Sequence, residues 1–300
     1  MDRKRRVFPR FYFLSNNELL EILSRMKTPS AILPFLRKCF EGIYFLEFDK
    51  FEDIIAMKSQ EGETVTLSRN LKSRGNVEDW LGVVEQDMQK SLRREMKLAY
   101  QEYEEDPADR AEWTKWFPSQ VVATVSQVMW CMAIEEALNG QHDAIDALDE
   151  QCHYTKDQLH ELIKMIRGQL NDVERRRIVA LITQDVHNRD IVERLRDEEV
   201  SSSHDFRWQQ QLRYLWNSEL DEVYIQQVNA EFIYGHEFLG ATTRLVITPL
   251  TDRCWITITG ALHIKLGASP AGPAGTGKTE STKDLAKALG VFCVVFNCSE

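Results

Sequence analysis

The 300-residue sequence lacks the cysteine pattern of a redox or zinc site, because none of its six cysteines forms a C-x-x-C pair. The cysteines are Cys39, Cys131, Cys152, Cys254, Cys293 and Cys298. We expect reduced thiols, with Cys293 and Cys298 buried as small apolar residues. His153 and His160 have no acidic or cysteine partners at ligand spacing, so no metal centre is predicted from them.

Excess positive charge and long apolar runs are also missing. The formal net charge of −10 argues against a protein that grips nucleic acid through its phosphates. No stretch approaches the roughly 18 apolar residues that cross a bilayer, so no membrane insertion is expected. The basic run from Arg3 to Arg6 reads as a solvated, charged entry to the next segment, with a localisation patch as the alternative. The remaining composition, 43% hydrophobic and 28% charged, is that of a globular protein.

Short elements are predicted in the first 70 residues. Ser15 and Glu18 have capping-box spacing ahead of an apolar helix face, and a second short helix is expected over 31–39, with Pro34 in its first turn. A strand is expected over 43–48. Residues 53–59 and 64–68 should then pair as a hairpin, with Gly62 in the turn.

Helical periodicity dominates the next 120 residues. Apolar residues recur three or four positions apart from Val77 to Leu92, and a break is expected at Pro107. Residues 118–140 predict an apolar helix ending at Gly140. Residues 155–199 predict one long helix containing Gly168. Strict heptads are not sustained, so packed helices are favoured over a coiled coil. Four large side chains are assigned to the core: Trp113, Trp116, Met129 and Trp130.

The last third changes character. A polar break and an aromatic-rich helix are expected over 201–217, and one or two strands over 222–235. A glycine-rich loop, a helix and an apolar strand over 291–298 follow. A domain boundary is therefore predicted between residues 200 and 235.

The glycine-rich loop matches the G-x-x-x-x-G-K-[ST] pattern of a phosphate-binding loop. The match is Gly272, Pro273, Ala274, Gly275, Thr276, Gly277, Lys278 and Thr279. Glycines let backbone N–H groups turn toward phosphate oxygens, and the lysine brings positive charge to the β- and γ-phosphates. The Thr279 hydroxyl would serve Mg²⁺, and the helix N-terminus adds its positive dipole end. A mere glycine turn that caps a helix does not explain the lysine and threonine.

Several phrases of the sequence resemble the dynein heavy chain family. Residues 272–300 are similar to the phosphate-loop region of that motor's first AAA+ module, and 234–255 to the segment leading into it. Residues 7–23 and 36–43 resemble the preceding linker. The resemblance is spread over nearly the whole chain. Some details favour an axonemal member, although a cytoplasmic one would share much of the pattern.

The resemblance implies a mainly α-helical linker with a small β-hairpin over 1–220, then the truncated start of an α/β P-loop (AAA+) domain over 221–300. ATP or ADP with Mg²⁺ would bind from Gly272 through Glu280, with Thr279 on the metal ion. By the same resemblance, an adenine-packing loop matches Leu245, Val246, Ile247, Thr248 and Pro249. Taken without the resemblance, that run reads as an ordinary buried strand.

The resemblance also implies what to expect of function. The complete motor would couple ATP hydrolysis to linker movement and microtubule sliding, with intermediate and light chains, in the cytoskeleton of a ciliary or flagellar axoneme. The acidic residues for hydrolysis are expected beyond Glu300, and the chain is expected to be a fragment that does not turn over ATP alone. Two alternatives remain open: a non-catalytic helical interaction module with a vestigial nucleotide site, and another P-loop enzyme such as a small kinase.

Overall fold

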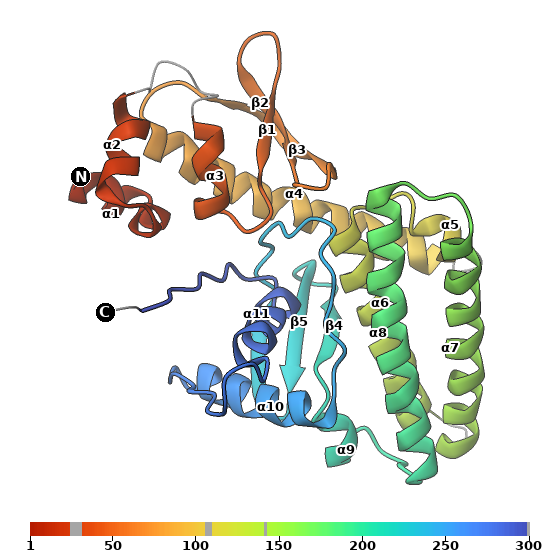
Figure 1. The fold of residues 1–300 in the computed structure, drawn as a ribbon. Coiled ribbons are helices and arrows are strands. Elements are labelled where there is room, and N and C mark those ends of the chain that lie inside the picture. Colours follow the sequence, from red (N-terminus) through yellow and green to blue (C-terminus); the bar gives the residue numbers. More distant parts are fainter. Residues whose placement is uncertain (25–31, 106–109, 141–142, 299–300) are drawn as a thin grey trace. The chain divides into compact units, whose positions relative to one another are not determined.

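The computed structural model describes residues 1–24, 32–105, 110–140 and 143–298 (Figure 1). Their contacts group into two compact units. The first unit contains residues 1–95, 235–241 and the chain from Gly290 onward; the second contains 96–234 and 242–289. These packing units are not the linker and AAA+ domains proposed above, whose boundary at 220 stays a prediction.

The first unit opens with short helical elements. They are α1 (Asp2–Val7), the 3-10 helix η1 (Pro9–Phe13), α2 (Asn16–Ser24) and α3 (Leu33–Cys39). The predicted capping box is confirmed, because the Glu18 N–H donates to Ser15 Oγ at 3.3 Å and the Ser15 N–H to Glu18 Oε2 at 3.0 Å. Pro34 lies in the first turn of α3, as expected. The predicted start at Ala31 and the break at Pro107 lie outside the described residues.

A three-stranded antiparallel sheet follows, in the order β1 (Phe45–Phe48), β2 (Asp53–Lys58), β3 (Thr64–Lys72). Lys58 pairs with Thr64 across the predicted hairpin. Gly62 has φ of +95°, a left-handed conformation that glycine adopts without steric cost. Helix α4 (Val77–Glu105) then begins, and its predicted apolar positions are all buried. The strand, the hairpin and this helix are therefore confirmed.

The second unit is built mainly from helices. After the C-terminal part of α4 come α5 (Arg110–Trp113), α6 (Ser119–Asn139), α7 (Ala144–Arg167), α8 (Asp172–Asp197) and α9 (Phe206–Gln209). A second antiparallel sheet has the order β4 (Arg213–Asn217), β5 (Glu222–Gln227), β6 (Ala230–Ile233). The last two helices are α10 (Pro249–His263) and α11 (Lys278–Ala288). The mainly helical fold class with a small hairpin is confirmed.

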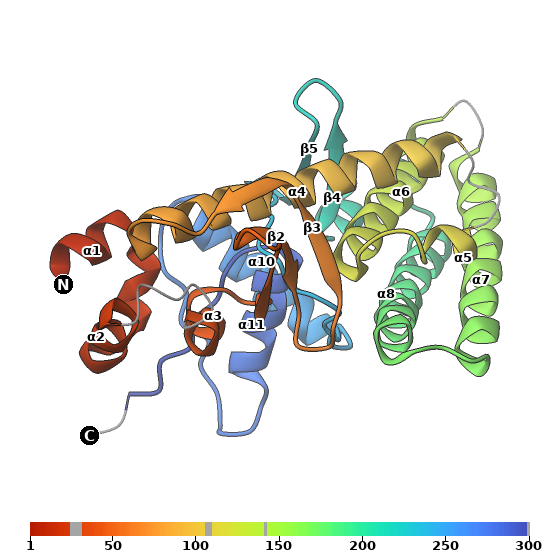
Figure 2. The ribbon, with the colours of Figure 1, turned by 90° about the horizontal axis from the view of Figure 1, so that it is seen from above.

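The prediction of one long helix over 155–199 is wrong. The chain forms α7 and α8 instead, which lie side by side (Figure 2). Helix α7 ends at Gly168, and Asn171 and Glu174 form a reciprocal capping box that starts α8. Two helices joined this way bury apolar faces against each other, which one continuous rod could not do.

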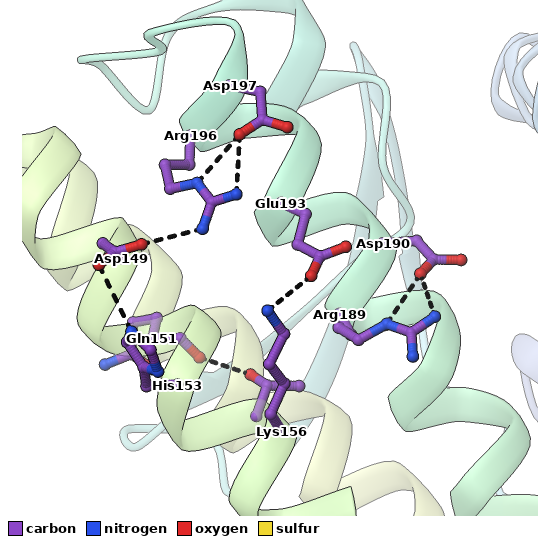
Figure 3. Close-up of polar contacts among 10 residues, drawn as sticks. Asp149, Gln151, His153, Lys156, Arg189, Asp190, Glu193, Arg196 and Asp197 are labelled. Carbon is purple, nitrogen blue, oxygen red and sulfur yellow. Dashed lines mark hydrogen bonds and ion pairs between the residues drawn. The ribbon is translucent and has the colours of Figure 1, made fainter.

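Ion pairs reinforce the α7–α8 contact at its exposed side (Figure 3). Arg196 on α8 reaches Asp149 on α7 at 2.9 Å, and Lys156 on α7 reaches Glu193 on α8 at 2.8 Å. These groups are partly exposed, so solvent screens each pair and its contribution to stability is small. The buried faces of the two helices are therefore the larger source of stability.

Helix α6 is the central helix of the second unit. By length and composition it could cross a membrane, contrary to the expectation that no such stretch exists, but most of it is buried in the protein. Its Gln127 exchanges two amide hydrogen bonds with Asn188 of α8, at 3.3 and 3.1 Å. A buried helix that hydrogen-bonds its neighbour through side chains is typical of a globular core. It ends at Gly140 as predicted, but in an extended rather than a left-handed conformation.

The expected core role of four large side chains is only partly right. Trp113 is buried and packs edge-on against Tyr103, whereas Trp116 is 60% exposed. Met129 and Trp130 are half-buried. The spacing of apolar residues predicts that these side chains lie on helices. It does not predict which helix faces are covered by other parts of the protein.

A further prediction, for residues 201–217, is wrong. Most of the aromatic-rich segment 201–217 does not become a helix: only four residues form α9, and residues 213–217 form strand β4. In β4, Tyr214 pairs with Ile225 of β5 and Trp216 pairs with Val223. The two aromatic residues are therefore two positions apart, which is the period of a strand. The two strands expected over 222–235 are confirmed as β5 and β6.

The apolar segment 291–298 is not a strand, and among the described residues no strand runs directly into the glycine loop, because helix α10 is the element before it. A parallel strand requires hydrogen bonds from a neighbouring strand, and the described chain supplies none at either place. Cys293 is half-buried and Cys298 exposed, so the expectation of two buried thiols is also wrong. Strands β5 and β6, which contact α10, therefore supply the β structure of residues 221–300, while the glycine loop leads only into its following helix.

Candidate nucleotide site

The predicted phosphate loop runs directly into helix α11. Gly275 and Gly277 have φ of +77° and +79°, and Gly277 is the residue that caps the helix. A Cβ at either glycine would meet no atom within 4 Å, so the backbone conformation rather than crowding favours glycine here. The sequence pattern and the turn geometry therefore agree.

The backbone donors of this loop are available for an anion. Among the described residues, the N–H groups from Gly275 to Thr279 make no hydrogen bond, and the first donor that does is Ser281, to the Gly277 carbonyl at 2.8 Å. Orphan N–H groups at a helix N-terminus, together with the helix dipole, form an anion-binding site. The loop thus fits a phosphate group.

Lys278 folds back over the loop that carries it. Its Nζ donates to the Gly272 carbonyl at 2.8 Å, contacts the Pro273 carbonyl, and lies 3.3 Å from Thr276 Oγ1. An ammonium held over the loop lies where it would meet phosphate oxygens. Thr279 is exposed beside it in the first turn, with its hydroxyl free to bind a cation within the described part of the chain.

Glu280, also assigned to the site, points along the helix surface. Its carboxylate pairs with Lys283 one turn later, at 3.0 Å. The geometry therefore brings the loop glycines, Lys278 and Thr279 together. A nucleotide contact from Glu280 stays a prediction.

The segment assigned to adenine, Leu245–Pro249, is not the buried strand that its apolar run suggested. Residues 243–248 have no regular structure, and α10 begins at Pro249 with Thr248 Oγ1 accepting the Thr251 N–H at 3.3 Å. Val246 is 75% exposed and Leu245 42%. An apolar residue left this exposed on a loop is open to an additional contact, such as a purine face.

Helix α11 connects the two predicted parts of the site. Asp284, on the buried side of α11, accepts the backbone N–H of Leu245 at 3.4 Å and pairs with Arg244 at 3.3 Å. Trp255 of α10 donates from its indole nitrogen to the Ser281 carbonyl at 3.1 Å. The helix that starts at Lys278 is therefore attached to both the Leu245 segment and α10.

Sequence reasoning missed Asp284, Arg244 and Trp255. A single aspartate on a polar helix looks like a solvated charge, and only the structure shows that Asp284 is 2% exposed. Burial alone would lower the pKa of Arg244, but Asp284 beside it and the nearby tyrosines raise it. Arg244 therefore stays charged although it is buried.

A pocket lies behind the Leu245 segment, within the second unit. Leu245 and Ile247 line it together with residues of α6, α8 and α10. Among its titratable side chains, desolvation lowers the pKa of His187 to about 4 and raises that of Asp252 to about 6. The neutral forms of both groups are thus favoured, as expected for a poorly solvated space.

A helical region joined to a G-x-x-x-x-G-K-T loop at a helix N-terminus is the organisation of a P-loop NTPase module with a helical extension. Two family models match the chain: "Dynein heavy chain, N-terminal region 2" over residues 1–99, and "Hydrolytic ATP binding site of dynein motor region" over 234–300.

Several known proteins are similar to this chain over its whole length. The human protein named Dynein axonemal heavy chain 6 is 48% identical over 321 aligned positions, and mouse Dynein axonemal heavy chain 1 is 49% identical over 300. Mouse Dynein axonemal heavy chain 3 is 46% identical. Each alignment covers 100% of this chain but only 7–8% of the relative. The chain belongs to the dynein heavy chain family: its beginning matches an N-terminal region of that family, and its last 67 residues match the hydrolytic ATP-binding region.

Proposed function

We propose that this chain supplies the phosphate-binding part of a dynein motor ATPase, and that ATP or ADP binds at Gly272–Thr279. The observation that carries the proposal is the loop itself, whose free backbone N–H groups precede an 11-residue helix with Lys278 folded over them. The match of residues 234–300 to a dynein ATP-binding region supports it.

The loop glycines, Lys278, Thr279 and the exposed part of the adenine segment then each have a physical role. The glycines and backbone N–H groups hold the β-phosphate, and Lys278 moves from the loop carbonyls to the phosphate oxygens. Thr279 provides a hydroxyl ligand for Mg²⁺, which neutralises phosphate charge when bound. Val246 and Leu245, the exposed members of the adenine segment, offer apolar surface to the base.

The motor's wider activity is part of the proposal. The relatives' names and the family suggest an axonemal motor that acts on microtubules with intermediate and light chains in a cilium or flagellum. In that motor, nucleotide turnover would move the helical linker of residues 1–220.

Thermal unfolding of the 300-residue chain with and without Mg-ADP tests the proposal. A ligand that binds only the folded state stabilises it by about 2.7 kcal/mol when its concentration is 100 times Kd. We expect a rise in Tm for the wild type and none for Lys278→Ala. Lys283→Ala, an exposed change on the same helix, is the matched control and should retain the rise.

Two results would overturn the proposal. One is a wild-type Tm that Mg-ADP leaves unchanged, which would favour a helical interaction module with a vestigial loop. The other is an equal rise in wild type and Lys278→Ala, which would place the nucleotide elsewhere.

A further inference from the structure

Arg10 lies at the centre of a cluster of charged and aromatic side chains in the first unit. None of the residues assigned to the nucleotide site belongs to this cluster. The two terminal nitrogens of Arg10 donate to Glu237 Oε1 and Oε2 at 2.9 and 2.7 Å, a bidentate pair in which Glu237 is 2% exposed. Its Nε donates to Glu85 at 3.1 Å. Such an arrangement fixes a guanidinium in both position and orientation.

Two aromatic rings lie against the same guanidinium. The Arg10 Cζ atom lies 5.0 Å from the centre of the Phe40 ring and 4.7 Å from that of Phe292. Phe292 also packs edge-on against Phe13, with ring centres 5.5 Å apart. Arg10 therefore holds residue 292 by stacking and residue 237 by charge.

These two residues flank the segment that carries the whole predicted nucleotide site. Glu237 lies in the stretch 235–241, directly before that segment, and Phe292 lies four residues after α11 ends. The two flanks also contact each other, because the Glu237 N–H donates to the Gly290 carbonyl at 2.8 Å. A Cβ on Gly235 would lie 2.6 Å from the same carbonyl, so this approach requires glycine. Residues 242–289 thus leave the first unit and return to it at one place.

We propose that Arg10 is a positioning residue that clamps both ends of the segment 242–289 and couples nucleotide binding at the phosphate loop to the N-terminal unit. The coupling rests on the proposed nucleotide binding; the clamp does not. Helix α11 has the phosphate loop at its N-terminus and ends two residues before Gly290, so it can carry a displacement from one to the other. Helices transmit such shifts because packed elements move as rigid bodies.

Hydrogen exchange of the 300-residue chain with and without Mg-ADP tests both parts. The variant is Arg10→Lys, which keeps the charge but loses the bidentate fork. The control is Arg196→Lys, on the exposed side of α8. Without nucleotide, we expect amides at 235–241 and 290–292 to exchange at least tenfold faster in Arg10→Lys than in Arg196→Lys. Equal exchange in the two variants would overturn the clamp.

With Mg-ADP, we expect slower exchange at 275–285 in the wild type and in both variants. Slower exchange at residues 8–13 should accompany it in the wild type and Arg196→Lys only. Persistence of that effect in Arg10→Lys, or its absence in a wild type that is protected at 275–285, would overturn the coupling. A wild type without protection at 275–285 refutes the nucleotide proposal and the coupling together, while the nucleotide-free comparison still decides the clamp.

A second variant tests the clamp in case the Arg10→Lys protein does not fold. Phe292→Leu removes one ring from the guanidinium and leaves the Arg10–Glu237 pair intact. We expect it to weaken the nucleotide-linked protection of residues 8–13 and to leave that of 275–285 unchanged. Full protection at 8–13 in this variant would exclude Phe292 from the clamp.

Discussion

Asp284 Oδ1 lies 3.4 Å from the backbone nitrogen of Leu245, so the helix that follows the phosphate loop holds the segment assigned to adenine. The same oxygen lies 3.3 Å from Arg244 Nε. One carboxylate thereby fixes two neighbouring residues of a loop that has no regular secondary structure. The placement of Leu245 depends on Asp284 as much as on its own sequence.

Asp284→Asn should lower the free energy of unfolding by about 3 kcal/mol, because it leaves the buried Arg244 without its counter-charge. Urea denaturation measures this loss. Asp190→Asn is the matched control, since Asp190 pairs with Arg189 on an exposed surface and should lose less than about 1 kcal/mol. Similar losses in the two variants would show that the Arg244 pair is no more important than a surface pair.

Gly277→Ala and Gly260→Ala should change stability in opposite directions. A Cβ at either site meets no atom within 4 Å, but Gly277 has φ of +79° while Gly260 lies within helix α10. Alanine at 277 is expected to cost about 1–2 kcal/mol in the left-handed region and to weaken Mg-ADP binding. Alanine at 260 should stabilise by about 1 kcal/mol and leave binding unchanged. Calorimetry and ligand titration on each variant check both effects, and equal behaviour of the two would contradict the assigned loop geometry.

His187 and Asp252, which line one pocket, should give opposite pH dependences of stability. The pKa of His187 falls from 6.5 to about 4 through desolvation, with Arg194 and Arg244 acting in the same direction and Asp190 opposing. Its contribution is therefore present above pH 6.5 and lost as pH falls toward 4. Desolvation raises the pKa of Asp252 from 3.8 to about 6, against Arg194. Its contribution is present below pH 3.8 and lost as pH rises through 6.

The two contributions partly cancel in the wild type between pH 4 and 6, and single variants separate them. Relative to wild type, Asp252→Asn should gain stability as pH rises from 4 to 6, by on the order of 2 kcal/mol. His187→Gln should lose relative stability over the same range. Unfolding free energies at several pH values measure both trends, and parallel curves for all three proteins would contradict the pKa shifts.

Local features could be predicted from the sequence where one short pattern of residues determines them. The Ser15–Glu18 capping box, the Gly62 turn and the phosphate loop each need only a few adjacent residues, and all three have the predicted local form. The capping box of Asn171 and Glu174 has an equally clear pattern. It was overlooked because the apolar period runs on through Gly168.

Features that depend on residues far apart in the sequence could not be predicted from the sequence. Strand β4 exists because Tyr214 pairs with Ile225, and its residues alone favour a helix as readily. The burial of Asp284 depends on Arg244, 40 residues earlier in the chain. The segment 291–298 is apolar enough for a strand but finds no partner strand in the described chain, so composition alone overestimated its order.

The Arg10–Glu237 pair has a consequence for the order in which the protein folds during synthesis. Its two residues are 227 positions apart, and Gly290 and Phe292 are farther still from Arg10. Residues 1–95 therefore leave the ribosome long before the residues that complete their unit. Helices α7 and α8, by contrast, are neighbours in sequence and can pack as soon as both are made. Although domains usually fold in the order of their synthesis, here the first unit should be completed after the second.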